Sequence, residues 1–200
     1  MDLKKGLSLT AFGFAFVLIN LNLTLGGVTL NVTPDFIGWI MLTLAVDRLG
    51  KYTDGKKYLK FVALVMVILS ASVWTLQIMK PEYDISILTT LENVVAAVFM
   101  FIFFGCLELV ANDYGSPRES TIRTLKILTL ALNIAMVTVV PLHKTMPLET
   151  FAVIFAVLGV AAIVTAIVTL IVLFKLRDEI HEKLDAPAAA EETEEAEEAE

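Results

Sequence analysis

The chain has 200 residues, of which 57% are hydrophobic and 18% are charged, and its mean hydropathy is +0.77. Ordinary soluble domains contain about 25% charged residues, so this composition excludes such a domain and indicates a compact domain embedded in a membrane. The single cysteine, Cys106, excludes an intramolecular disulfide and a metal site built from several cysteines.

The net charge of -7 arises at the C-terminal end of the chain. Residues 177–200 contain eleven acidic and two basic side chains, whereas residues 1–176 contain eleven acidic and thirteen basic ones. The final run of Glu, Ala and Thr has too few apolar side chains to bury a core. We therefore predict a transmembrane domain over residues 1–176 and a mostly disordered acidic cytoplasmic tail over residues 177–200, with a short helix continuing from Lys175 to about Leu184.

Six apolar segments predict an all-α bundle of six transmembrane helices. They cover about residues 7–25, 34–49, 59–79, 85–110, 125–140 and 148–176. The first has the basic start of a signal peptide, but it is long and lacks a cleavage motif, so we expect a retained helix.

The lysines and arginines orient these segments. With the N-terminus in the cytoplasm, thirteen of them fall on the cytoplasmic side and only Lys80 and Lys144 on the outer side, as the positive-inside rule requires. Both termini are therefore predicted to be cytoplasmic. The second segment, about 16 residues long, gives only about 24 Å of helix, so a re-entrant loop is an alternative. Because such a loop would place the basic cluster of residues 48–60 outside, we predict a full crossing.

The connection between the first two segments carries turn and strand signals. Gly26 and Gly27 are expected to end the first helix, and residues 28–33 alternate apolar and polar side chains, which predicts a short extended segment at the outer surface. The second helix is predicted to begin with Thr33 as its cap, Pro34 as its first residue and Asp35 next to the positive end of the helix dipole.

Residues 31–40, Asn-Val-Thr-Pro-Asp-Phe-Ile-Gly-Trp-Ile, carry a recognisable pattern. This segment resembles a signature of small multi-pass membrane proteins of Gram-positive bacteria, in which a Pro-Asp-Phe-Ile-Gly-aromatic-Ile run opens the second helix. The resemblance covers about the first 50 residues. It implies a bacterial plasma-membrane protein and assigns no active residue, and Gly38 also has a structural explanation, since it allows a neighbouring helix to approach.

Catalytic motifs are missing from the sequence. It contains no zinc-protease or serine-hydrolase motif and no phosphate-binding glycine loop, and His143 and His181 fall on opposite sides of the predicted membrane. We therefore predict neither an enzyme nor a cofactor nor a metal site, and we expect no nucleic-acid partner.

Polar side chains within the apolar segments are the main functional lead, because burying them in lipid is costly. They concentrate in the outer halves of the helices, which predicts a polar cavity that opens to the outside and narrows near mid-membrane, with Glu92 as its central residue. The candidate ligand-binding residues are Glu92, Asn93, Asn133, Gln77, Asn20 and Asp35. The alternative is structural: the long fourth helix would place Glu92 at the lipid headgroups, and the amide side chains would hold helices together.

The sixth segment carries a stripe of small residues, which lets another helix approach closely. Its members are Ala152, Ala156, Gly159, Ala162 and Ala166. We expect this stripe to pack inside the bundle, and contact with a second copy or a partner membrane protein is the alternative. The phenylalanines of the fourth segment are expected to face lipid or fill the core; they are Phe99, Phe101, Phe103 and Phe104.

Two functions fit these observations. The chain is a small transporter, or the membrane subunit of one, that uses the outward cavity, or it is a non-transporting sensor, scaffold or accessory subunit. A water-accessible cavity lined by Glu92, Asn93 and Asn133 would favour the first function. A solid core with these residues at its rim would favour the second.

Overall fold

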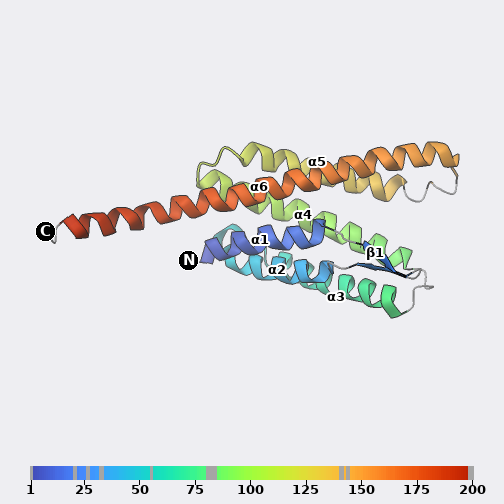
Figure 1. Cartoon of the computed structure of the whole chain (residues 1–200), viewed down its shortest axis with the longest axis horizontal. Coiled ribbons are helices and arrows are strands. Elements are labelled where there is room, and N and C mark those ends of the chain that lie inside the picture. Colours follow the sequence, from blue (N-terminus) through green and yellow to red (C-terminus); the bar gives the residue numbers. More distant parts are fainter. Residues whose placement is uncertain are drawn as a thin grey trace.

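The computed structural model has the predicted architecture, a bundle of six α-helices (Figure 1). It describes residues 2–19, 22–25, 28–31, 34–54, 56–79, 85–139, 142 and 145–197, with side chains for all of these except 22–31, 57 and 187–197. The helices are α1 (Asp2–Leu18), α2 (Asp35–Arg48), α3 (Lys57–Met79), α4 (Ser86–Asp113), α5 (Glu119–Val139) and α6 (Leu148–Glu197). A 3-10 turn, η1 (Gly50–Tyr52), follows α2, and the strands β1 (Asn22–Leu25) and β2 (Val28–Asn31) lie between α1 and α2.

Four of the described helices, α3, α4, α5 and α6, are long and apolar enough to cross a membrane. The other two are shorter, with 17 residues in α1 and 14 in α2, which correspond to about 26 Å and 21 Å of helix. The chain is thus a helical integral membrane protein in which α1 and α2 are the short members of the bundle.

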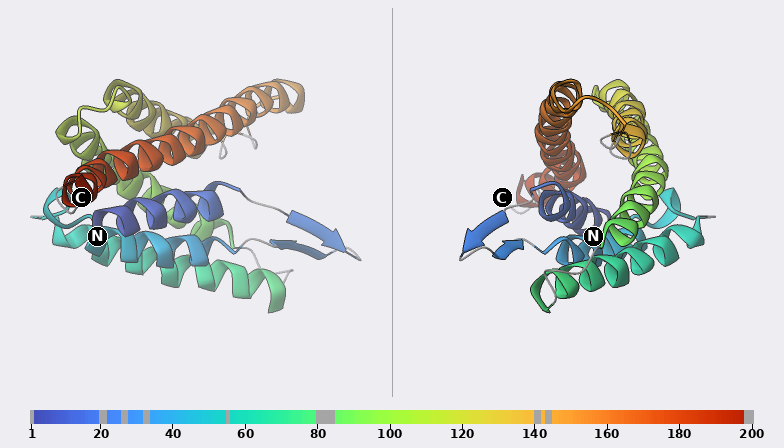
Figure 2. Two further views of the ribbon diagram at one scale, coloured as in Figure 1. Left: turned by 60° about the vertical axis from the view of Figure 1, so that its left-hand side comes forward. Right: turned by 90° about the vertical axis from the view of Figure 1, so that its right-hand side faces the viewer.

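The six helices form a closed ring. Each helix packs against its neighbours in sequence, and α6 packs against α1 to complete the circle. The right-hand view of Figure 2 shows this arrangement close to end-on, with α6 and α5 above and α1 to α4 below. All six helices can therefore present side chains to one common interior.

The first apolar segment differs from the prediction of one helix over residues 7–25. Helix α1 ends at Leu18, and residues 22–25 form β1, which pairs antiparallel with β2 in a register that places Asn22 opposite Asn31. The reason lies in the alternation of Asn22, Leu23, Thr24 and Leu25, a period of two that mirrors the predicted strand pattern of β2. Residues 28–31 confirm that strand prediction, while residues 26, 27, 32 and 33 lie outside the described residues.

Helices α1 and α2 pack in close contact through two glycines. A Cβ atom added to Gly38 would lie 2.6 Å from the Gly13 carbonyl oxygen and 2.7 Å from Cγ2 of Val17. The expected role of Gly38 in close packing is confirmed. Pro34, however, is the N-terminal cap residue of α2 rather than its first helical residue, with φ -63° and ψ 119°, so that Asp35 begins the helix. The predicted cap, Thr33, lies outside the described residues.

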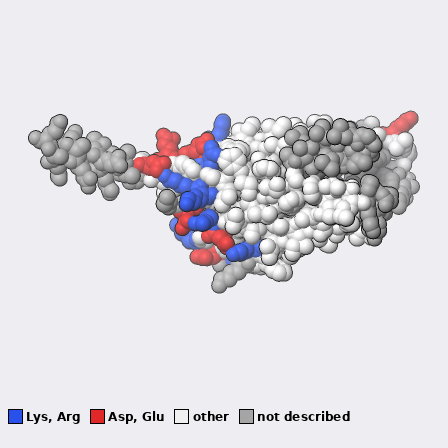
Figure 3. Space-filling model, turned by 60° about the horizontal axis from the view of Figure 1, so that its bottom comes forward, with Lys and Arg blue, Asp and Glu red and all other residues white. Residues whose placement is uncertain are grey.

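Ion pairs gather at the end of the bundle that carries the N-terminus and the C-terminal part of α6, which we call the charged end (Figure 3). Asp2 pairs with Arg48, Asp47 with Lys60 at 2.7 Å, and Lys51 with Asp113 at 2.8 Å. Glu108 accepts hydrogen bonds of 2.6 Å from both Arg123 and Lys126. Asp47 and Glu108 therefore both have basic partners at the charged end. The opposite end, where the β1–β2 hairpin lies, is called the hairpin end.

Aromatic side chains fill the interior between the charged end and the middle of the bundle. Phe14 of α1 lies 5.4 Å from Phe104 and 6.0 Å from Phe103 between ring centroids, and Trp39 of α2 lies 5.2 Å from Phe99. All five of these rings are at most 1% exposed. The phenylalanines of α4 thus form core, except for Phe101, which is 39% exposed.

Helix α6 continues beyond Leu184, where we expect its cytoplasmic extension to end, as far as Glu197. Its first turns past the bundle are attached to it, because Lys183 donates a hydrogen bond of 2.6 Å to the Tyr114 carbonyl and the His181 ring lies 3.0 Å from the Lys4 carbonyl. Figure 1 shows the remaining turns projecting past the other helices. Of the tail predicted over residues 177–200, residues 187–197 are described by their backbone alone, and residues 198–200 lie outside the described residues.

Candidate ligand cavity

A cavity of about 370 Å³ lies inside the ring, and all six helices contribute to its lining. The contributing side chains follow helical spacing, because Thr89, Asn93, Ala96, Met100 and Phe104 of α4 recur every three or four residues and so share one face. Helix α3 contributes a similar face that includes Ser70 and Gln77. The ring therefore encloses a pocket with side chains from every helix around it.

Five of the six candidate residues line this one cavity. They are Asp35 of α2, Gln77 of α3, Glu92 and Asn93 of α4, and Asn133 of α5. The sixth, Asn20, lies outside the described residues. The structure thus brings together residues from four helices that are up to about 100 positions apart in sequence. Their role in binding a ligand remains a prediction.

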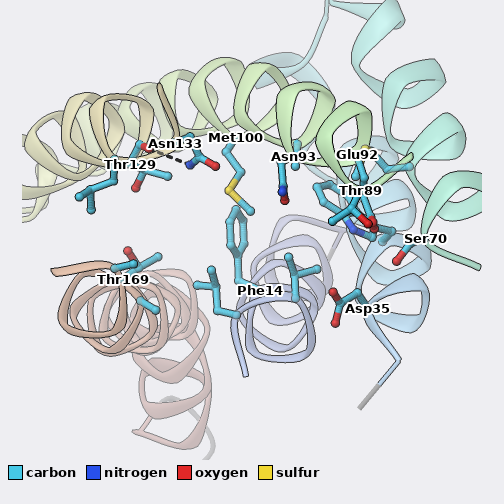
Figure 4. A pocket seen from close by; sticks show the side chains of 18 of the residues that line it. Phe14, Asp35, Ser70, Thr89, Glu92, Asn93, Met100, Thr129, Asn133 and Thr169 are labelled. Atoms are coloured by element: carbon cyan, nitrogen blue, oxygen red, sulfur yellow. Dashed lines mark hydrogen bonds between the residues drawn. The ribbon is translucent and has the colours of Figure 1, made fainter. Parts of the chain in front are cut away.

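The polar lining forms two groups (Figure 4). Asp35, Ser70, Thr89 and Glu92 lie on one side, Thr129, Asn133 and Thr169 lie on the other, and in this view Phe14 and Met100 lie between them. The first group belongs to α2, α3 and α4, and the second to α5 and α6. The cavity is therefore polar at opposite walls and apolar across its middle.

Glu92 lies next to Ser70 from the neighbouring helix, and both side chains line the cavity (Figure 4). The Ser70 side chain is buried, whereas Glu92 is half-buried. Among the described residues, no Lys or Arg forms an ion pair with Glu92. This contact differs from those of the carboxylates at the charged end, where Asp2, Asp47 and Glu108 each have a cationic partner.

Asn133 donates a hydrogen bond of 2.8 Å from its side-chain amide to the Thr129 carbonyl of its own helix. This bond orients the side chain at the cavity wall, as Figure 4 shows. Ser72 and Thr75 of α3 are also polar, and their hydroxyl groups donate to the Ile68 and Ala71 carbonyls of the same helix, but neither residue lines the cavity. Polarity alone therefore does not identify the lining residues. A polar residue lines the cavity only if it lies on the face of its helix that is directed at the interior of the ring.

The lining changes along the bundle axis. Toward the hairpin end, Asp35, Gln77 and Thr89 are partly exposed and Asn93 is exposed. Toward the charged end, Phe14, Trp39, Met66 and Phe104 line the cavity and are at most 1% exposed. The aromatic core thus forms the floor of the cavity, and access decreases from the hairpin end inward.

Several lining residues were not among the candidates. The missed residues are mainly threonines and aromatic or apolar side chains: Thr89, Thr129, Thr165, Thr169, Trp39, Trp74, Phe14 and Phe104. The threonines of α6 recur at a spacing of four, together with Ala162 and Ala166, which also line the cavity. This spacing would have indicated a face directed at the interior.

The small-residue stripe of α6 is therefore divided between two surroundings. Ala162 and Ala166 line the cavity, whereas Ala152 and Ala156 are exposed, and a Cβ atom added to Gly159 would meet nothing within 4 Å. The expected packing inside the bundle is thus wrong for the first three members, because the ring turns their side of α6 away from its neighbours.

The chemistry of this site is that of a polar binding pocket. It offers carboxylates, amides and hydroxyls, and within the described ranges no three His, Cys, Asp or Glu side chains come together as metal ligands. No protein-family model matches the sequence, and neither curated proteins nor solved structures give a match. The functional argument therefore depends on the geometry of the cavity.

Proposed function

We propose that the protein is a small solute transporter, or the solute-binding membrane subunit of one, in the bacterial plasma membrane. The observation that carries this proposal is the cavity of about 370 Å³ whose lining includes Glu92, Asn93 and Asn133. Its volume is at the lower end of the 300–1,000 Å³ that small-molecule pockets occupy. A carboxylate and several amides inside a membrane bundle are costly unless water or a ligand reaches them, and such residues commonly mark a solute pathway.

The charge distribution supports an orientation with both termini in the cytoplasm. The described Lys and Arg side chains cluster at the charged end, which the positive-inside rule assigns to the cytoplasmic face. The cavity would then open through the hairpin end toward the outside, and the aromatic floor would separate it from the cytoplasm. Such a geometry would correspond to an outward-open state, and transport would then require a second arrangement of the helices around the same site.

A non-transporting accessory subunit is the second candidate function. It is favoured by the C-terminal turns of α6, which project past the bundle, and by the exposed side of α6 around Ala152, Ala156 and Gly159. A second copy or a partner membrane protein would pack on that side, because small residues permit close approach. In this case the cavity would be closed to water.

Cysteine labelling separates the two functions. In a chain whose only cysteine is replaced, Cys106→Ala, the changes Gln77→Cys, Asn93→Cys and Asn133→Cys place single thiols in the cavity. A membrane-impermeant maleimide added outside intact cells should label them, because thiols react as thiolates in water.

The matched controls are Val94→Cys and Ile134→Cys, the next residues on the same helices, which are exposed on the outer surface and do not line the cavity. These thiols face lipid and should react at least about tenfold more slowly. If all three cavity thiols were as unreactive as the controls, the transporter proposal would be wrong. Labelling only from the cytoplasmic side would contradict the proposed orientation.

A further inference from the structure

We infer that the cavity selects small organic cations, meaning ammonium-type molecules with an apolar portion. This inference rests on the proposed function, since it names the class of solute. The first observation is charge: among the described residues, the lining includes the carboxylates of Asp35 and Glu92 and no Lys, Arg or His. Inside a membrane bundle, where the dielectric constant is low, two carboxylates attract a cation and exclude an anion far more strongly than they would in water.

The second observation is the contrast between Glu92 and other carboxylates. Glu108 is paired with two basic side chains and Asp113 with one, whereas the described contact of Glu92 is the Ser70 hydroxyl. A carboxylate that is half-buried without a cation is costly, and a bound cation would offset that cost. Asp35 adds negative charge at the first turn of α2, where the helix dipole partly balances it.

The third observation is the aromatic wall. Trp39, Trp74, Phe14 and Phe104 line the same cavity as the two carboxylates. Aromatic faces bind cations through their quadrupole and pack against apolar groups. Among the described residues, no three His, Cys, Asp or Glu side chains come together as ligands for a metal ion, whereas the aromatic faces suit a cation that carries an apolar portion. The lining therefore matches an organic cation.

The chain supplies its own reporter for a test. Its sequence contains two tryptophans, Trp39 and Trp74, and both line the cavity, so intrinsic fluorescence reports on this site. Trp39 is 1% exposed and Trp74 is half-buried, so Trp39→Phe leaves Trp74 as the single accessible reporter. The purified full chain, in nanodiscs of zwitterionic lipid assembled with a tryptophan-free scaffold protein, would be titrated with three quenchers at constant ionic strength: neutral acrylamide, cationic N-methylpyridinium and anionic benzoate. Each quenching constant is divided by that of N-acetyltryptophanamide.

The expected result is quenching by acrylamide and a preference of about tenfold for the cation over the anion, which corresponds to 1.4 kcal/mol. Glu92→Gln should remove most of this preference and leave acrylamide quenching unchanged. Glu149→Gln, which removes the same charge from an exposed residue at the start of α6, should change neither.

The outcomes distinguish this inference from the proposed function. Strong acrylamide quenching with equal quenching by the two ions, in the chain that retains Glu92, would overturn cation selection and leave an accessible cavity. A cation preference that survives Glu92→Gln but is lost in Asp35→Asn would also overturn the stated role of Glu92. Absence of acrylamide quenching would show that the cavity is closed, and would overturn the proposed function and this inference together.

Discussion

The charged half and the hairpin half of the bundle place their polar groups in different ways. In the charged half, carboxylates pair with Lys or Arg at the surface, and buried rings such as Phe14 and Phe103 fill the interior. In the hairpin half, Glu92 and Asn93 face a cavity inside the ring. The same helices pass through both halves, so the difference comes from side chains alone. One half of the bundle is thus filled by packed rings, and the other half encloses a polar cavity.

We expect the largest loss of stability when a buried ring is removed from the charged half of the bundle. Phe103→Ala removes a ring that is fully buried and stacked 5.2 Å from Phe99. Large-to-small core changes cost about 3–5 kcal/mol in soluble proteins, and we expect about 3 kcal/mol here, because lipid weakens the hydrophobic part of the cost. Thermal unfolding in detergent, followed by circular dichroism, measures this loss.

Phe101→Ala is the control for this change, because Phe101 is on the same helix but 39% exposed. We expect it to change stability by less than about 0.5 kcal/mol. Equal losses for the two variants would show that the buried rings do not form a packed core.

The next largest loss of stability is expected when the close contact between the short helices α1 and α2 is disturbed. Gly38→Ala places a methyl group 2.6 Å from the Gly13 carbonyl oxygen, so that α1 and α2 must separate. We expect a loss of about 1–3 kcal/mol from this overpacking, measured by the same unfolding assay.

Gly159→Ala is the matched glycine change, since its added methyl group meets nothing within 4 Å. Alanine is the better helix former, so we expect a gain of roughly 0.5–1 kcal/mol. A loss of stability at Gly159 would indicate that this side of α6 contacts another helix, as the accessory-subunit function requires.

The smallest changes in stability are expected when either of two glutamates, Glu108 or Glu92, is replaced by glutamine. Glu108→Gln weakens two ion pairs whose acidic member is 16% exposed, and we expect a loss of about 1 kcal/mol that shrinks as salt is added. Glu92→Gln removes a charge that has no basic partner in the described part of the chain, so stability should stay the same or rise. Chemical unfolding at low and high salt separates the two. A larger loss for Glu92→Gln would assign that residue a structural role.

The architecture was largely predictable from hydropathy and charge, because lipid requires long apolar segments and leaves little choice in their number. The hairpin was not predicted at its first strand. Leu23, Thr24 and Leu25 are all acceptable in a membrane helix, so a prediction based on hydropathy assigned them to the first helix. The alternation of apolar and polar residues that is typical of a strand was not recognised there. The resemblance of residues 31–40 to a bacterial signature remains a prediction.

The cavity was partly predictable for a related reason. Glu92, Asn93 and Asn133 stand out because polar residues are rare in apolar helices, and each occupies the face that lines the cavity. Phe101 and Phe103 cannot be distinguished from sequence, since both lipid and core accept a phenylalanine, yet one is exposed and the other fully buried. Which of the two is buried depends on the rotation of α4 about its own axis, and that rotation is seen only in the structure.

The closure of the ring by α1 and α6 has a consequence for how the chain is made. Every other large helix contact joins elements that are consecutive in sequence, so those pairs can form as each helix leaves the ribosome. Helix α1 must wait for α6, which is synthesised roughly ten seconds later at about 5–20 residues per second. During that interval the polar wall of Glu92 and Asn93 has no complete enclosure and faces lipid or the insertion machinery. We therefore expect membrane insertion to include a stage in which the polar wall is formed but not yet enclosed by all six helices.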